Sequence, residues 1–323
     1  MTIRIGLLGA SRIARGAIIA PARDNSDFEV AAVAARDPDR ARAYAVEHGI
    51  PIVVDDYQAL IRRDDLDLIY NALPPAGHRP WTIAALEAGK HVLCEKPFAR
   101  NAGEAKEMVA AADASGRRLI EAFHYRLHNV MRAAVAIAHE GDLGPLKSAE
   151  AVFDGPIPKT PGELRWSAEQ AGGALMDLGC YPLHALRSVF GAEPEVTDAT
   201  CVFEDGVDAS TRANLTFPGG ATATLACSMI AEGFAANLNV VGERGSMEIR
   251  NFIAPQMGCR FVTTIDGVRR DHGVEGPSTY AAQLTHVAEV LAGRTTPLTG
   301  GADAIGNMVA IDAIYRAAGR PAG

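Results

Sequence analysis

Short apolar runs alternate with amphipathic stretches over the first 123 residues of the chain. Runs rich in Ile, Leu and Val predict buried strands at residues 3–8, 28–35, 52–54, 66–72, 91–94 and 119–123. Apolar positions at helical spacing predict helices between them, at residues 11–22, 39–48, 78–88 and 103–114. Strands that alternate with helices over short connections form a parallel sheet covered on both faces. We therefore expect a doubly wound α/β domain over residues 1–123.

The pattern changes after about residue 146, where strand-rich sequence replaces the alternation. Alternating or β-branched residues predict strands at 196–203, 210–217, 221–229, 236–241, 246–249, 260–265 and 267–272, and helical spacing predicts helices at 173–190, 279–291 and 302–317. Gly-rich turns between the strands indicate an α+β domain over residues 124–323, built on a large, mostly antiparallel open sheet. The last helix is expected in this domain or packed back on the first. A sheet this wide needs cover on its second face, which favours a homodimer or homotetramer formed through the sheet.

The composition narrows the classes of protein to consider. Of the 323 residues, 48% are hydrophobic and 22% are charged, as is typical of globular domains. No apolar run is long enough to cross a bilayer, and residues 1–6 enter a strand pattern instead of a signal peptide, so we expect no membrane contact. Five cysteines without a Cys-x-x-Cys pair indicate reduced thiols in a cytoplasmic protein with no metal site. The net charge of −8 comes without a basic stripe, which argues against nucleic acid as a partner.

A glycine turn stands between the first expected strand and the first expected helix. Gly9, Ser11 and Ala14 occupy the positions of the Gly-x-Gly-x-x-Gly/Ala fingerprint that binds a dinucleotide pyrophosphate. Ser11 replaces the middle glycine and brings a hydroxyl that can itself bind phosphate. Because the turn opens a βαβ series, it favours a Rossmann cofactor site, with Arg12 and Ile13 beside the ligand, over a tight turn without a ligand.

The end of the second expected strand distinguishes NADP from NAD. Chains that prefer NAD usually carry Asp or Glu there for the ribose hydroxyls, whereas this chain carries Arg36, whose planar guanidinium suits a 2′-phosphate. Asp37 is expected to cap the helix that begins at Pro38. We therefore favour NADP(H), with NAD(H) as the alternative cofactor. The alternative role of Arg36 is a surface charge that balances Asp37 or Asp39.

Two further loops lie at the carboxyl edge of the expected sheet, where ligands bind in such folds. The loop at residues 71–78 contributes three candidate cofactor contacts: Leu73, Pro74 and His78. A histidine at a helix start is, however, more often structural. The next strand ends in Glu95-Lys96-Pro97. The proline stiffens the backbone around Lys96, and a stiff, partly desolvated lysine suits proton transfer; the alternative is a solvated loop pair.

The helix expected at residues 173–190 carries three polar side chains on an otherwise apolar sequence. Asp177, Tyr181 and His184 are spaced by four and three residues, so on an α-helix they share one face. Such a face has to line a cleft or find buried partners. The alternative is that backbone groups of the second domain satisfy these side chains.

Together these motifs resemble the glucose–fructose oxidoreductase, inositol dehydrogenase and rhizopine catabolism family, usually called Gfo/Idh/MocA. The resemblance covers essentially the whole chain and rests on Gly9, residues 71–78, residues 95–97 and residues 172–181. Residues 121–126 and Tyr181 are most similar to the branch that holds dimeric dihydrodiol dehydrogenase, NADP-dependent xylose dehydrogenase and glucose–fructose oxidoreductase.

The resemblance implies that Lys96 is the central catalytic residue, with Asp177 and Tyr181 as its partners across the domain cleft. Further implied contacts are Glu95, Lys96 and Arg165 for the cofactor, and Tyr125, Arg126, Trp166 and His184 for the substrate. Many members have histidine where this chain has Tyr181, and aspartate where it has His184. This departure concerns the part of the motif that contacts the sugar.

The expected reaction is an NAD(P)-dependent hydride transfer between nicotinamide and a carbinol carbon of a sugar, cyclic polyol or trans-dihydrodiol. The hydroxyl proton would leave to Tyr181, whose ordinary pKa of about 10 a neighbouring Lys96 ammonium would lower. Asp177 would orient one of this pair or bind a substrate hydroxyl. Glu95 would hold Lys96 in position.

Two alternatives come from other classes of function. A dinucleotide-binding regulator without catalysis is expected to lose the lysine or its proton partner, and this chain keeps Lys96 and Tyr181. A ketoreductase acting on a nucleotide-linked sugar needs extra cations in the second domain, which Arg126, Arg165 and Lys159 could supply.

Overall fold

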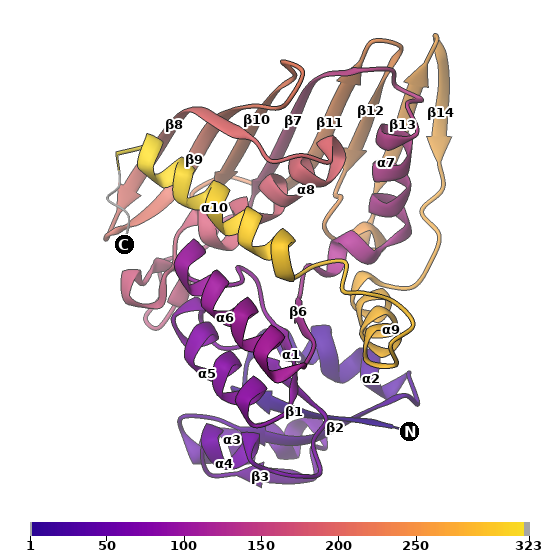
Figure 1. The fold of residues 1–323 in the computed structure, drawn as a ribbon. Helices are drawn as coiled ribbons and strands as arrows, with labels where there is room; N and C mark the ends of the chain where they lie inside the picture. The colour runs from indigo at the N-terminus through magenta and orange to yellow at the C-terminus, as the bar shows by residue number, and fades with distance from the viewer. Residues whose placement is uncertain (1, 320–323) are drawn as a thin grey trace. The chain divides into compact units, whose positions relative to one another are not determined.

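The computed structural model describes residues 2–319, which divide into two compact units (Figure 1). The first unit comprises the chain up to His124 together with Tyr280–Ile305. The second comprises Tyr125–Thr279 together with the chain from Gly306 onward. The chain therefore contributes to the first unit twice, before and after it forms most of the second.

The first unit is built on a six-stranded sheet. Its strands are β1 (Ile3–Leu8), β2 (Phe28–Ala34), β3 (Ile52–Val54), β4 (Leu68–Asn71), β5 (His91–Cys94) and β6 (Leu119–Glu121). Every pairing is parallel, and the strand order is β3-β2-β1-β4-β5-β6. The expected Rossmann-type sheet is thereby confirmed. The order reverses between β1 and β4, and such a switch point is where doubly wound sheets bind their ligands.

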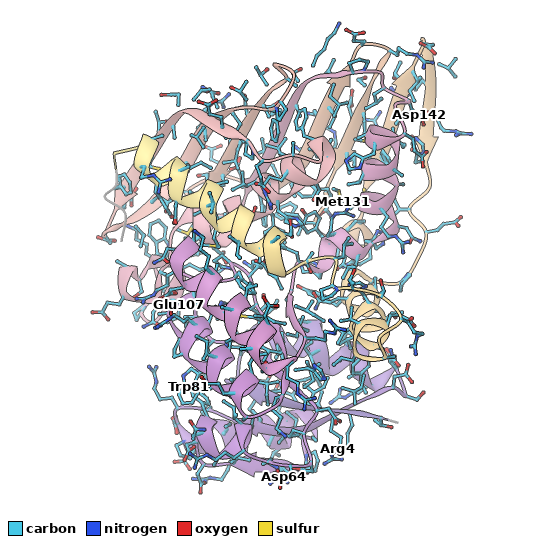
Figure 2. The ribbon with its side chains drawn as sticks, in the orientation of Figure 1. Arg4, Asp64, Trp81, Glu107, Met131 and Asp142 are labelled. Carbon is cyan, nitrogen blue, oxygen red and sulfur yellow. The ribbon has the colours of Figure 1, made fainter. Side chains whose placement is uncertain are left out.

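The helices of the first unit follow the predicted rhythm with two differences. They are α1 (Arg12–Ala14), the π-helical turn η1 (Arg15–Ile19), α2 (Ala20–Arg23), α3 (Pro38–His48), α4 (Tyr57–Ile61), α5 (Pro75–Glu87), α6 (Ala102–Ser115) and α9 (Thr279–Leu291). The single helix predicted at 11–22 is interrupted by η1, and α4 was not predicted. Figure 2 labels Trp81 on α5 and Glu107 on α6; these helices lie side by side, and an Arg79–Glu107 ion pair joins them.

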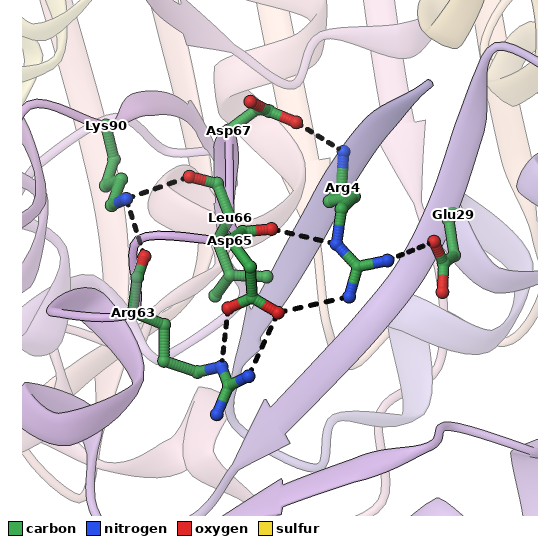
Figure 3. A network of polar contacts seen from close by, with 7 residues as sticks. All are labelled: Arg4, Glu29, Arg63, Asp65, Leu66, Asp67 and Lys90. Carbon is green, nitrogen blue, oxygen red and sulfur yellow. Dashed lines mark hydrogen bonds and ion pairs between the residues drawn. The ribbon is translucent and has the colours of Figure 1, made fainter. Parts of the chain in front are cut away.

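A polar network fastens the amino ends of the parallel strands (Figure 3). The Arg4 backbone N–H donates to the Asp67 carboxylate at 2.8 Å, and the Arg4 guanidinium contacts Asp65 and Glu29. The Lys90 ammonium donates to the carbonyls of Arg63 and Leu66, at 2.6 and 2.9 Å. The network ties β1, β2 and the segments before β4 and β5 together at the edge opposite the carboxyl ends of the strands.

The second unit is built on an eight-stranded sheet with the order β14-β13-β12-β11-β7-β10-β9-β8. Its strands are β7 (Leu146–Asp154), β8 (Glu195–Glu204), β9 (Val207–Thr216), β10 (Thr222–Ser228), β11 (Ala235–Gly242), β12 (Gly245–Arg250), β13 (Arg260–Ile265) and β14 (Val268–His272). The β7–β10 pair is parallel and the remaining described pairs are antiparallel, which confirms the mostly antiparallel sheet. The central strand β7 was not predicted.

Figure 1 shows α7, α8 and α10 on one face of this sheet. The helical elements are η2 (His124–Leu127), α7 (Asn129–His139), η3 (Leu164–Trp166), η4 (Ala168–Gln170), the π-helical turn η5 (Leu175–Gly179), α8 (Cys180–Phe190), η6 (Pro255–Met257) and α10 (Gly301–Ala317). The helix α7 was not predicted. The helix predicted at 173–190 is a π-helical turn followed by an α-helix, and this changes the register of its side chains.

Candidate functional site

The glycine turn after β1 requires a glycine at its first position. Gly9 has a φ of +95°, and its N–H donates to the Ala34 carbonyl at 2.8 Å. A Cβ at this position would lie 3.1 Å from Leu73 Cδ2. The backbone of Gly9 therefore lies close to the loop after β4, as a turn that admits a pyrophosphate requires.

Ser11 is the N-cap of the first helix: its Oγ accepts a hydrogen bond from the Ala14 N–H at 3.3 Å. The hydroxyl proton is then still able to donate to a phosphate oxygen. The backbone of this residue is held as well, because the Tyr44 hydroxyl donates to the Ser11 carbonyl at 2.9 Å. Arg12 and Ile13 are exposed at the helix start.

Two arginines lie at the carboxyl end of β2, of which the sequence pattern pointed to one. Arg36 is exposed, and Asp37 caps α3 through the N–H groups of Asp39 and Arg40, as predicted. The Arg40 guanidinium donates to the Ala10 carbonyl at 2.8 Å, so it lies against the glycine turn. Burial raises the pKa of Tyr57, while the charges of Arg36 and Arg40 oppose that rise. Both cations therefore lie near Tyr57, and Arg40 also contacts the glycine turn.

The loop after β4 is fixed by buried polar contacts. The Asn71 amide donates to the His78 carbonyl at 3.2 Å and to Thr82 Oγ1 at 3.1 Å. The His78 ring is fully buried, with Nε2 2.7 Å from the Leu73 carbonyl and Nδ1 2.9 Å from the Pro97 carbonyl. His78 was named as a candidate cofactor contact with a structural role as the alternative; its ring bridges two loops, and burial lowers its pKa. Leu73 and Pro74 are partly exposed.

Glu95 and Lys96 follow β5 at the same edge. The Glu95 carboxylate is buried and accepts the Tyr70 hydroxyl at 2.6 Å and the Lys96 backbone N–H at 3.2 Å. Lys96 is partly exposed, and the Lys96–Pro97 peptide bond is cis. The carboxylate therefore holds the backbone from which the lysine side chain extends.

Two aromatic rings lie near the Lys96 charge. The His124 and Tyr280 ring centroids are 4.1 Å apart. Burial, and to a lesser extent the Lys96 charge, lower the pKa of His124 to about 3. Burial and the Glu95 charge raise the pKa of Tyr280 to about 12 against the opposing effect of Lys96. Both rings are neutral near pH 7, so they add no charge of their own beside the ammonium.

Asp177 in the second unit lies beside Arg165. The Arg165 guanidinium donates to the Glu163 carboxylate through Nε and Nη2, both at 2.8 Å, and its Nη1 lies 3.8 Å from Asp177 Oδ2. Asp177 belongs to the π-helical turn η5, so the spacing argument that placed it on one face with Tyr181 and His184 assumed the wrong helix type.

Tyr125 and His184, two of the candidate substrate contacts, lie within hydrogen-bond distance of each other. The Tyr125 hydroxyl lies 2.6 Å from His184 Nδ1, and the two residues are 0% and 1% exposed. The Tyr125 ring centroid is 5.6 Å from that of Tyr181, as is the Phe153 centroid. The buried pair therefore supports the ring of Tyr181. Arg126, also a predicted substrate contact, is partly exposed.

The loop before η5 closes on itself through Trp166. The indole N–H donates to the Ile157 carbonyl at 2.9 Å, and Lys159 Nζ lies 4.5 Å from the ring centroid. Lys159 Nζ is also 2.7 Å from the carboxylates of Glu204 and Asp205. Both predicted cations of this region, Lys159 and Arg165, are thus paired with carboxylates of the chain.

Comparison with known proteins agrees with this geometry. The profile described as "Oxidoreductase family, NAD-binding Rossmann fold" matches residues 3–123, and the "GFO/IDH/MocA C-terminal domain" matches residues 131–248. The chain belongs to the Gfo/Idh/MocA oxidoreductase family. The resemblance seen in the sequence is thereby confirmed.

Three of the similar proteins carry informative names. The D-xylose 1-dehydrogenase (NADP(+)) 2 of Haloferax volcanii is 33% identical over 97% of this chain and 96% of its own. The trans-1,2-dihydrobenzene-1,2-diol dehydrogenase of Mus musculus is 35% identical over 79% of this chain and 77% of its own. The structure of a 3-ketoreductase from Actinomadura kijaniata with NADP and TDP-benzene superposes with a TM-score of 0.89, at 28% identity and 98% coverage of both chains.

Residues 2–319 contain neither a metal-binding cluster nor a membrane-spanning helix. In that range no group of three or more His, Cys, Asp or Glu side chains could hold a metal ion. No helix described there is long and apolar enough to cross a membrane.

Three further residues lie in these regions and were not named as candidates from the sequence. They are Arg40, His124 and Tyr280. Arg40 had a weak signal, since it stands in the first turn of a helix that begins beside Arg36. His124 stood inside the run at 121–126 without a role of its own. Tyr280 had no signal, because it follows the second unit in sequence and lies in the first.

The pKa of His124 predicts an acid-dependent loss of stability. In the unfolded chain His124 binds a proton near pH 6.5, whereas in the folded chain it does so near pH 3, so acid favours the unfolded state. Lowering the pH from 7 to 5 should cost about 2 kcal/mol of unfolding free energy through this group. Urea unfolding of the wild type and His124→Gln at both pH values measures it, and the variant should lose less on acidification. The exposed His139→Gln serves as control; an equal pH dependence in all three proteins would contradict the assignment.

Proposed function

We propose that the protein is an NADP(H)-dependent oxidoreductase that transfers hydride between nicotinamide and a carbinol carbon of a sugar, cyclic polyol or trans-dihydrodiol. The observation that carries the proposal is the Arg40 guanidinium against the glycine turn together with Arg36 just after β2, with no acidic ribose ligand at the end of β2. A 2′-phosphate is the group that such a cation pair recognises. The names of the Haloferax and Actinomadura proteins, both with NADP, support the same cofactor. NAD(H) is the alternative.

The turn fits a dinucleotide on geometric grounds. Gly9 has the positive φ of a turn without a side chain, so its backbone can approach a pyrophosphate. Ser11 caps the helix behind it and keeps a hydroxyl proton to donate. The exposed Ile13 offers an apolar surface at the same helix start, 42% exposed. Arg36 and Arg40 would hold the 2′-phosphate.

Lys96, Tyr181 and Asp177 would carry the proton chemistry. A bound nicotinamide supplies or accepts the hydride. Tyr181 would take the hydroxyl proton of the substrate, and the Lys96 ammonium would favour the ionised phenol. Asp177 would bind a substrate hydroxyl, with its charge partly balanced by Arg165 at 3.8 Å. Glu95 would hold the backbone of Lys96 through the 3.2 Å contact with its N–H.

The charge pairs of the second unit favour an uncharged substrate over a nucleotide-linked sugar. A diphosphate needs cations that can turn toward it. Lys159 is paired with Glu204 and Asp205, and Arg165 with Glu163. A diphosphate beside these pairs would meet the carboxylates as well as the cations. A nucleotide-linked sugar is the second candidate substrate, because the similar Actinomadura protein is named as a 3-ketoreductase in complex with TDP-benzene.

The oligomer is proposed to form through the eight-stranded sheet, as a homodimer or homotetramer. Figure 1 shows the helices of the second unit on one face of this sheet. Along β11 and β12 buried residues alternate with exposed ones such as Asn239, Val241 and Glu248. The face without helices therefore carries exposed side chains that a second copy could cover.

Removing either arginine should shift the cofactor preference. Arg36→Ala and Arg40→Ala should each weaken NADPH binding by about tenfold, through loss of a charge-assisted contact, and should leave NADH binding nearly unchanged. Fluorescence titration with both cofactors measures this. The control is Arg42→Ala, since Arg42 is exposed and paired with Asp39 on the same helix. Tighter binding of NADH than NADPH by the wild type would refute the NADP assignment.

Removing either proton-transfer residue should slow turnover more than it weakens binding. Lys96→Ala and Tyr181→Phe should each lower kcat by about 100-fold or more, the usual contribution of a positioned acid or base. The dissociation constant for NADPH should change little. Steady-state kinetics with NADP and a panel of aldoses, polyols and dihydrodiols gives kcat, and the exposed Lys106→Ala is the control for loss of a charge in the first unit. Full activity of Tyr181→Phe would remove the tyrosine from the mechanism.

The substrate class can be separated by charge. Wild type should turn over free sugars or diols and should be inhibited only weakly by thymidine diphosphate. Glu163→Gln, which removes one carboxylate from Arg165, should strengthen that inhibition by about threefold to tenfold, the size of a partly exposed charge pair. Exposed Glu140→Gln, at the end of α7 in the same unit, is the control. Strong inhibition of the wild type, with faster turnover of a thymidine diphosphate-linked ketosugar, would instead establish the ketoreductase function.

A further inference from the structure

A buried carboxylate in the second unit joins three segments of the chain. Asp208 lies on β9 and is 0% exposed. Its Oδ2 accepts the Leu175 N–H and the Thr211 hydroxyl, each at 2.7 Å. Its Oδ1 accepts the Tyr315 hydroxyl from α10, also at 2.7 Å. The carboxylate thus holds the start of η5, its own strand and the C-terminal helix together.

Two glycines before η5 have no space for a side chain, and one of them lies directly against this carboxylate. Gly173 has a φ of +124°, and a Cβ there would lie 2.1 Å from Asp208 Oδ1. A Cβ at Gly172 would lie 2.4 Å from the Arg165 carbonyl, which itself accepts the Gly173 N–H at 2.9 Å. The backbone of the turn therefore packs directly against Asp208 on one side and against Arg165 on the other.

The segment that begins at this turn carries both polar residues assigned to the reaction in this unit. The Asp177 N–H donates to the Gly173 carbonyl at 2.9 Å, and Tyr181 follows one turn later on α8. A carboxylate that accepts an N–H at the start of a helical segment is favourable both as a cap and by its charge. Because Leu175 is bonded to Asp208, the position of this start is set by the buried carboxylate.

We propose that Asp208 is a positioning residue for the reaction, acting through the turn at Gly172 and Gly173 to place Asp177 and Tyr181, with Tyr315 extending the connection to α10. The inference rests on the proposed function, since it assigns Asp208 a part in placing the residues of that reaction. In this role Asp208 itself contacts neither substrate nor cofactor.

Replacing the carboxylate by an amide tests the proposal at nearly constant volume. In Asp208→Asn one acceptor oxygen becomes an NH₂ donor that faces buried donors, so the turn must shift to relieve the mismatch. Turnover should fall by about tenfold, a size that one lost buried hydrogen bond accounts for, while NADPH binding stays unchanged. Thr211→Val and Tyr315→Phe each remove one bond to the carboxylate and should give smaller losses of kcat in the same direction.

A matched control separates positioning from loss of stability. Thr263 is also a buried threonine in the same sheet, 2% exposed, with its hydroxyl 2.8 Å from His272 Nε2. Thr263→Val should lower Tm as Thr211→Val does, but it should leave kcat at the wild-type value. In the double variant Asp208→Asn with Tyr181→Phe, kcat should fall less than about twofold below that of Tyr181→Phe alone, because coupled residues are not additive. Independent multiplication of the two losses, or an equal loss of kcat in Thr263→Val, would overturn the proposal.

A fluorescence readout keeps this test independent of turnover. The chain has two tryptophans, Trp81 and Trp166, so Trp81→Phe leaves Trp166 as the reporter next to Arg165. Asp208→Asn in this background should shift the Trp166 emission, whereas Thr263→Val should not. If the wild type turns over none of the substrates, the proposed function fails, and a shifted emission still supports Asp208 as the holder of the turn. An unshifted emission together with wild-type kcat would refute the positioning role.

Discussion

The ring of His78 joins the loop after β4 to the loop after β5. One ring nitrogen lies 2.7 Å from the Leu73 carbonyl and the other 2.9 Å from the Pro97 carbonyl. Leu73 in turn lies against Gly9, where a Cβ would come within 3.1 Å of its side chain. The glycine turn, the loop after β4 and the backbone beside Lys96 are therefore one connected structure. A change in one of them is therefore expected to affect the others, because close-packed interiors transmit such shifts.

The groups that surround Lys96 in the first unit differ from those that surround Arg165 in the second. In the first unit, the rings of His124 and Tyr280 near Lys96 are neutral at pH 7, and burial keeps them so. In the second unit, Arg165 lies between the carboxylates of Glu163 and Asp177. The two rings thus leave the charge near Lys96 unchanged at pH 7, whereas the carboxylates around Arg165 largely balance its charge.

Local chemistry explains why much of the fold could be predicted and part of the site could not. Asp37 followed by Pro38 predicted a helix start, and Gly9 predicted a tight turn, because each depends on its own neighbours in sequence. The partners of His78 could not be predicted, since they are backbone carbonyls that only folding brings together. The π-helical turn η5 shifted Asp177 away from the regular spacing, and helical periodicity cannot show such an insertion.

The environment of Lys96 depends on chain order more than on any local motif. The chain leaves the first unit after His124 and enters it again at Tyr280, after it has formed most of the second unit. Leu284, Val287 and Val290 of α9 then join Ile18 and Leu93 in one buried cluster. The Tyr280 ring that packs against His124 is therefore held by apolar burial of a helix far downstream in sequence. The lysine motif by itself does not reveal this arrangement. The neutral Tyr280 ring near the ammonium is held in place by the packing of α9, far downstream in sequence.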